Sequence, residues 1–265
     1  WSLGLPPESA IILLAGIYYG AEYGGRISSI LLNVPGDASA VMTTLDGYPL
    51  ARNGHAGRAL SLSAIASFVG GSLSVILVTL FGPTMAAYAV TFSPSDYVAL
   101  MIFAFATLTS LVGTNPVKTL LAAVLGLMLA SVGIDANTGV ERYTFDIPDI
   151  LGGIDFLIVV IGLFGMAELF SLVEQHAAGT LKALKIDKSF VSWADIIRTR
   201  WTILRSAFIG FFIGVLPGTG ASVASAVAYG TEKRLVKDSS GFGQGDIRGL
   251  AAPEAANNAS AGGAM

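Results

Sequence analysis

Cysteine is absent from this chain of 265 residues, and charged residues make up only 12% of it. Without thiols the chain forms neither disulfides nor thiolate metal sites. Soluble domains carry about 25% charged residues, so this composition excludes an ordinary soluble domain. The net charge of −3 is too small to indicate a nucleic-acid partner. With 53% hydrophobic residues, the composition predicts an all-α integral membrane protein.

Histidine is scarce too, and the two present, His55 and His176, lie in predicted cytoplasmic connectors without metal-ligand spacing. The sequence offers no nucleophile–base pair, which argues against an enzyme. Gly243-Gln-Gly-Asp246 matches the pattern of intramembrane aspartyl proteases. It lies in a polar connector, and we expect no second aspartate in a membrane segment opposite it. An intramembrane hydrolase is therefore the less favoured alternative.

Glycine is abundant, with 32 residues, and two ladders of glycines spaced by four lead into Pro-Gly pairs. This spacing places small residues on one helix face, where backbones approach closely. Proline then breaks the helix, and a broken helix survives in lipid only where its freed backbone groups are satisfied. The breaks at Pro35–Gly36 and Pro217–Gly218 therefore predict a buried polar site of the kind that transporters build. The ladders are Gly16, Gly20 and Gly24, and Gly210, Gly214 and Gly218.

Apolar stretches predict a multi-span helical transporter fold with a broken, re-entrant hairpin at each Pro-Gly pair. Gly82-Pro83 is expected to end the span before it, and 133–153 is expected to be an exposed acidic loop. The basic segment 182–205 is expected to be cytoplasmic. The predicted helices and arms are 7–23, 27–34, 37–50, 60–81, 97–112, 117–132, 156–173, 201–216, 221–229 and 250–265.

The segment 15–25 is echoed by the segment 252–263, with their Gly-Gly pairs 238 residues apart. We interpret this echo as an internal structural repeat and expect the chain to be part of a protein roughly twice as long. The expected regions are a hairpin region of the first repeat (1–54), scaffold helices (55–175), a basic cytoplasmic connector (176–200) and a hairpin region of the second repeat (201–265).

The two breaks carry the candidate substrate site. A helix that begins after Pro35–Gly36 exposes free N–H groups, and these groups and the helix dipole favour an anion such as a carboxylate. The alternative is a kinked helix whose hydroxyls bond back to its own carbonyls. The candidate substrate-binding residues are Asn33, Pro35, Gly36, Ser39, Thr43, Pro217, Gly218, Thr219, Gly220 and Ser222.

Four residues are candidates for holding a coupling cation: Glu22, Glu254, Asn257 and Asn258. Glu22 is an ionisable residue at membrane depth, and Glu254 heads a cluster with two amides, whose oxygens suit a hard cation. Interfacial snorkelling and helix–helix hydrogen bonds are the alternatives. Arg26 pairs with a substrate carboxylate or reaches a lipid head group. Asp46 and Glu168 are weaker candidates, expected near the cytoplasmic face.

Several long motifs resemble the large membrane subunit of the tripartite tricarboxylate transporters, the TctA family. They are Gly16-Ile-Tyr-Tyr-Gly-Ala-Glu-Tyr-Gly-Gly25, Ile30-Leu-Leu-Asn-Val-Pro-Gly36, Thr44-Leu-Asp-Gly-Tyr-Pro-Leu-Ala51, Gly214-Val-Leu-Pro-Gly-Thr-Gly220 and Ala251-Ala-Pro-Glu-Ala-Ala-Asn-Asn-Ala-Ser-Ala-Gly-Gly263.

The resemblance implies a secondary transporter in the inner membrane of a bacterium, importing carboxylates such as citrate. It implies coupling to Na⁺ or H⁺ without other cofactors. It also implies a small membrane subunit (TctB-like) and a periplasmic solute-binding protein (TctC-like) as partners. A non-transporting assembly subunit remains the other alternative.

Overall fold

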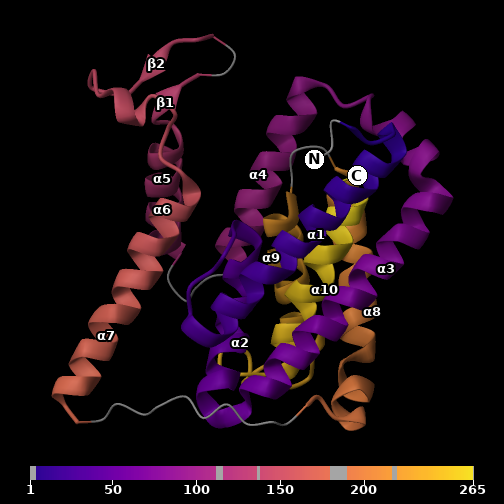
Figure 1. Ribbon diagram of the computed structural model, residues 1–265, viewed down its shortest axis with the longest axis vertical. Coiled ribbons are helices and arrows are strands. Elements are labelled where there is room, and N and C mark those ends of the chain that lie inside the picture. Colours follow the sequence, from indigo (N-terminus) through magenta and orange to yellow (C-terminus); the bar gives the residue numbers. More distant parts are fainter. Residues whose placement is uncertain (1–3, 112–115, 136–137, 180–189, 217–219, 265) are drawn as a thin grey trace.

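The computed structural model describes residues 4–111, 116–135, 138–179, 190–216 and 220–264. These residues are mostly helical, which confirms the predicted all-α class (Figure 1). The strands are the two-residue β1 (Gly133–Ile134) and β2 (Glu141–Arg142), which pair antiparallel within the predicted exposed loop.

Helix α10 (Ile247–Gly263) forms the centre of the bundle, and nearly all of its residues are buried. It packs against α3 (Ala56–Ala89), α8 (Trp193–Val215) and α9 (Gly220–Leu235), as Figure 1 shows. Its side chains are mostly small, so the surrounding helices approach its backbone closely. In the core of the protein, the backbones of neighbouring helices therefore pack closely against α10.

The second glycine ladder makes this close approach. A Cβ atom on Gly210 would lie 2.1 Å from the carbonyl oxygen of Ala256, and one on Gly214 would lie 2.3 Å from that of Ser260. The prediction is confirmed for these two positions, while Gly218 lies outside the described residues. It is wrong for Gly16, Gly20 and Gly24, where nothing described lies within 4 Å of an added Cβ. Spacing places glycines on one face but does not supply the helix that packs there.

The first break is present as predicted. Helix α1 (Pro7–Leu32) ends at Asn33, whose φ of 57° is left-handed, and the chain restarts in η2 (Ala38–Ala40) and α2 (Val41–Leu50). The predicted separation of 7–23 from 27–34 is wrong, because glycine keeps its N–H and the helical hydrogen bonds continue. Gly25 instead allows Gly36 to approach, and the Gly36 N–H donates to the Gly25 carbonyl at 3.3 Å.

Two further helix ends differ from the prediction. Helix α3 is joined to α2 by a kink in η3 (Ala51–His55), where Gly54 has a φ of 90°, and it continues through Pro83 to Ala89. One proline removes a single helical hydrogen bond, and the neighbouring turns hold the helix together. Helix α8 begins at Trp193 and not at residue 201, because Ser192 and Asp195 form a capping box.

Helix α4 (Pro94–Leu111) packs against α9 at the side of the bundle (Figure 1). The remaining elements, together with β1 and β2, form an arm beside the bundle. They are α5 (Pro116–Ala130), η4 (Pro148–Ile150), α6 (Phe156–Val160), η5 (Ile161–Gly165) and α7 (Met166–Ala177). Among the described residues, two helical segments are long and apolar enough to cross a membrane, Ala38–Tyr88 and Phe156–Ala177. The re-entrant hairpins and the internal repeat stay predictions.

Candidate functional site

Arg26, near the end of α1, lies at the centre of a buried charge network. Its side chain is 1% exposed and contacts three carboxylates. The distances are 2.5 Å from Nη1 to Asp37, 3.2 Å from Nη2 to Glu22 and 3.5 Å from Nε to Glu254. A guanidinium enclosed in this way does not reach a lipid head group, so the structure removes that interpretation of Arg26.

Asp37 caps the helix that restarts after the first break. Its Oδ1 accepts hydrogen bonds from the main-chain N–H groups of Ser39 (2.8 Å) and Ala40 (2.9 Å). The Ser39 hydroxyl accepts from Nη2 of Arg26 at 2.9 Å and bonds to the carboxylates of Glu22 and Asp37. The N–H groups freed at the break therefore do bind a carboxylate, and that carboxylate belongs to the protein.

Glu254, on α10, is completely buried. Its carboxylate accepts hydrogen bonds from the hydroxyls of Ser63 (2.7 Å) and Ser67 (3.1 Å) on α3, and from Thr43 on α2. Thr43 is expected to bind substrate, but in this structure its hydroxyl donates to Glu254. Three hydroxyls thus donate to this carboxylate, and Nε of Arg26 lies 3.5 Å from it.

The four residues predicted to hold a cation lie on facing parts of α1 and α10. Nδ2 of Asn257 donates to Oε2 of Glu22 at 2.9 Å. Because Arg26 donates to the same oxygen, Glu22 connects α10 to Arg26. Nδ2 of Asn258 donates to the main-chain carbonyl of Glu254 at 3.2 Å. The structure brings these residues together, and their roles in binding an ion stay predictions.

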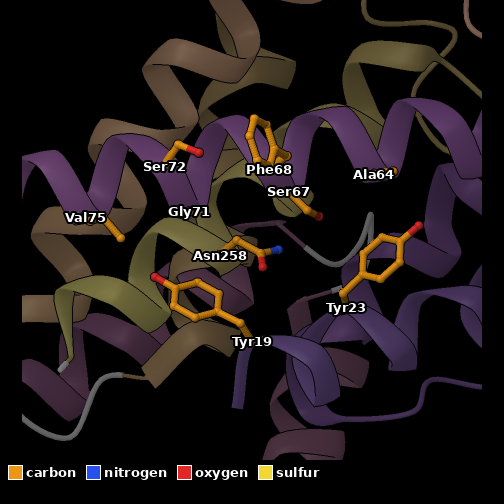
Figure 2. Close-up of a pocket in the computed structure, with 9 residues that line it drawn as sticks. All are labelled: Tyr19, Tyr23, Ala64, Ser67, Phe68, Gly71, Ser72, Val75 and Asn258. Atoms are coloured by element: carbon orange, nitrogen blue, oxygen red, sulfur yellow. The ribbon is translucent and has the colours of Figure 1, made fainter. Parts of the chain in front are cut away.

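A pocket of about 580 Å³ opens between α1 and α3, with α10 at its floor. Figure 2 shows the Asn258 side chain between the rings of Tyr19 and Tyr23, facing Ser67 on α3. Apolar groups such as Phe68 and Val75 make up most of the lining. Because Ser67 also bonds to Glu254, the α3 side of the pocket lies next to the charge network.

The second break lies partly outside the described residues, which exclude Pro217, Gly218 and Thr219. Gly220 begins α9 with a φ of 66° and is exposed, and Ser222 is half-buried. Segment η2, which follows the first break, packs against α9, which follows the second. At the first break Asn33 is half-buried, Pro35 is buried and Gly36 is exposed.

Asp46, a weaker candidate from the sequence, is a buried polar centre on α2. It is completely buried, and its Oδ1 accepts from the main-chain N–H groups of Gly243 (2.9 Å), Gly245 (2.8 Å) and Asp246 (2.9 Å). Its Oδ2 accepts from the Tyr229 hydroxyl at 3.0 Å. An aspartate in an apolar segment and a Gly-x-Gly loop were the sequence signals for this clamp.

Asp46 is a second aspartate that contacts the motif ending at Asp246. Asp46 meets the main chain of that motif, but its carboxylate is saturated by hydrogen bonds. The Asp246 carboxylate accepts from Nη2 of Arg248 at 2.6 Å and caps α10. The pair holds a connector in place and does not form an acid–base dyad.

The remaining candidates lie outside the charge network. Glu168, on α7, accepts from the Tyr48 hydroxyl at 2.5 Å and lies 3.9 Å from Arg52. His55 and His176 are both exposed, and His176 lies in the last turn of α7, not in a connector.

A helical bundle that buries a charge network beside a broken helix is typical of membrane transporters. The sequence model of the tripartite tricarboxylate transporter TctA family matches residues 1–265, and the chain belongs to this family. It therefore belongs to a family of transporter subunits and not of enzymes.

Two curated relatives come from Agrobacterium vitis. An uncharacterised 52.8 kDa protein in the TAR-I ttuC' 3' region is 38% identical over 255 residues, which cover 96% of this chain and 51% of the relative. An uncharacterised protein in the TAR-II ttuC' 3' region is 52% identical over 52 residues, covering 20% of this chain and 22% of the relative. The chain thus spans about half the length of the longer relative. No solved structure matches it.

Proposed function

We propose that this chain is the permease part of a binding-protein-dependent secondary transporter that imports carboxylates of the citrate class. Uptake is driven by a sodium or proton gradient across the inner membrane of a bacterium. The partners are a small membrane subunit and a periplasmic binding protein that delivers the substrate. Membership of the TctA family supports the general activity.

One observation carries the choice of substrate and its location. The Asp37 carboxylate is bound by the Arg26 guanidinium and by two main-chain N–H groups at a helix break. A guanidinium and free N–H groups at a helix start are donors complementary to a carboxylate. The Asp37 side chain is 28% exposed, so it lies at the accessible edge of the network. A substrate carboxylate replaces Asp37 on these donors.

The second break supplies the other side of the site in this proposal. Segment η2, which follows the first break, packs against α9, which follows the second. Asn33 and Ser39 approach the substrate from the first break, and Gly220 and Ser222 approach it from the second. Pro217, Gly218 and Thr219 stay predicted substrate-binding residues.

Uptake of radiolabelled citrate by cells that express the permease with its two partners tests this function. Arg26→Lys keeps the charge but loses the planar fork of donors, and we expect it to abolish uptake. Arg52→Lys, at a surface position 36% exposed, is the matched control and should transport normally. Asp37→Asn removes the competing charge, so its KM for citrate should equal or fall below that of the parent.

Each variant is quantified in isolated membranes so that a loss of protein is not mistaken for a loss of transport. Wild-type uptake by correctly inserted Arg26→Lys would rule out the proposed substrate site. It would favour the assembly-subunit alternative, in which polar residues at the break are dispensable. A KM that rises in Asp37→Asn would contradict the replacement of Asp37 by substrate.

A further inference from the structure

Two buried oxygen atoms on α10 have no hydrogen-bond partner among the described residues. They are Oδ1 of Asn257 and Oγ of Ser260, in side chains that are 0% and 1% exposed. The third such atom, Nε of Arg26, is a donor that faces Glu254 at 3.5 Å. A buried acceptor without a partner is unfavourable, so the two oxygens indicate a site where a ligand binds.

The geometry of α10 places these oxygens on one face. Residues three apart on a helix are neighbours, so Asn257 and Ser260 project to the same side. The amide of Asn257 is oriented by Glu22, because a carboxylate accepts the Nδ2 hydrogen bond and cannot donate to Oδ1. Oδ1 is therefore presented as an acceptor beside Glu22. Arg26, Ser39 and Asn257 all bond to Oε2 of Glu22.

The net charge of the network indicates that this ligand is a cation. Arg26 is the one cation paired with Glu22, Asp37 and Glu254 among the described residues, which leaves a formal excess of two negative charges. Hydroxyl and amide donors orient these carboxylates without neutralising them. Uncompensated charge is costly to bury, and a cation beside Glu22 reduces the excess although Arg26 opposes it.

The donor set also gives the charge of the cation. The described residues hold no group of three or more His, Cys, Asp or Glu side chains arranged to bind a metal. One carboxylate, one amide oxygen and one hydroxyl are hard, weakly charged ligands. Such a set suits a monovalent cation better than a divalent one.

We propose that the Glu22 carboxylate, Oδ1 of Asn257 and Oγ of Ser260 bind a monovalent cation of the sodium type. This inference rests on the proposed transport function, for which the site supplies the coupling ion. Glu22 is the accessible carboxylate, with its side chain 13% exposed, whereas Glu254 is completely buried. Glu254 is assigned as a fixed partner of Arg26 and three hydroxyls, and Asn258 is assigned to its own helix through the Glu254 carbonyl.

Thermal unfolding of the purified full-length permease tests the site without requiring transport. Sodium chloride is compared with choline chloride at equal ionic strength, and lithium, potassium and magnesium salts test selectivity. We expect sodium to raise the unfolding midpoint of the parent above its value in choline. Asn257→Leu and Ser260→Ala should weaken the apparent sodium affinity by about tenfold or more.

Ser225→Ala is the matched control, because Ser225 is also completely buried and its hydroxyl already donates to the Pro253 carbonyl. It should keep the sodium response of the parent. Ser260→Ala removes a hydroxyl without a partner, so in choline its midpoint should equal or exceed that of the parent. It also carries the test if Asn257→Leu fails to fold.

Two results would overturn the cation site: equal midpoints of the parent in sodium and choline, or an unchanged sodium response in Ser260→Ala. The fate of the proposed function is read separately from citrate uptake. Uptake that persists without sodium on a proton gradient would keep the permease function and remove the cation site. Absence of uptake, with a sodium response that Ser260→Ala abolishes, would keep the site and remove the function.

Discussion

The amide of Asn257 donates to the carboxylate of Glu22 over 2.9 Å, joining residues 235 positions apart. The bond connects the two segments that echo each other in sequence, 15–25 on α1 and 252–263 on α10. The two helices are in contact beside the first break (Figure 1). The echo therefore marks two helices that line the same buried network from opposite sides.

The close packing of α8 against α10 predicts that adding one methyl group between them greatly lowers the stability of the protein. A Cβ on Gly210 would meet the Ala256 carbonyl oxygen at 2.1 Å, and this oxygen belongs to a rigid buried helix. Gly210→Ala should lower the free energy of unfolding by about 1–3 kcal/mol or more, because the helices must separate. Denaturant or thermal unfolding of the purified protein measures the loss.

Gly16→Ala is the control for that substitution, since nothing described lies within 4 Å of an added Cβ there. Alanine favours helix over glycine by about 1 kcal/mol, so this variant should be neutral or slightly more stable. Equal stability of the Gly210→Ala and parent proteins would show that this packing is looser than described.

The Asp46 clamp predicts that one side chain holds the connector 236–246 in place. Asp46→Ala deprives three main-chain N–H groups of their acceptor, at about 1–3 kcal/mol for each buried group left without a partner. We expect a loss of at least about 3 kcal/mol and faster proteolysis within the connector. Asp46→Asn keeps Oδ1 and should be less damaging.

Asp238→Ala is the matched control for the clamp, because Asp238 is exposed in the same connector. Its unfolding and its rate of cleavage should resemble those of the parent. A connector as resistant to proteolysis in Asp46→Ala as in the parent would contradict the clamp.

The ion pair between Arg58 and Asp195 predicts an acid-sensitive contact between α3 and α8. Hydrogen bonding to Arg58, whose Nε lies 2.9 Å from Oδ2, lowers the pKa of Asp195 from 3.8 to about 2. Because the folded pKa lies below the unfolded one, the pair stabilises the fold fully above pH 3.8 and loses this contribution as the pH falls toward 2.

Unfolding midpoints of the parent and Asp195→Asn measured between pH 7 and pH 2 check this contact. The parent should be the more stable protein at pH 7, and the difference should shrink below pH 3.8. Asp149→Asn, at an exposed site in the loop 133–153, is the control and should follow the parent. A difference that stays constant down to pH 2 would exclude the ionised pair as its cause.

Apolar stretches predicted where the helices lie but not where all of them end. Gly24-Gly25 and Gly82-Pro83 are local signals of a break, yet α1 and α3 continue through them. The chain stops being helical at Asn33, where the left-handed residue is followed by Val34-Pro35 and Asp37 caps the next turn. A glycine or proline alone weakens a helix, whereas a break requires partners that satisfy the freed groups.

The sequence by itself determined the membrane-type composition, the helical class, the first break and the family, because these follow from residue types and their local spacing. Only the tertiary structure decided that Arg26 contacts three carboxylates, that Asp46 binds the 243–246 loop, and that Gly210 and Gly214, unlike Gly16, contact another helix. Such contacts depend on which helix faces pack together, and residues far apart in the chain set that choice.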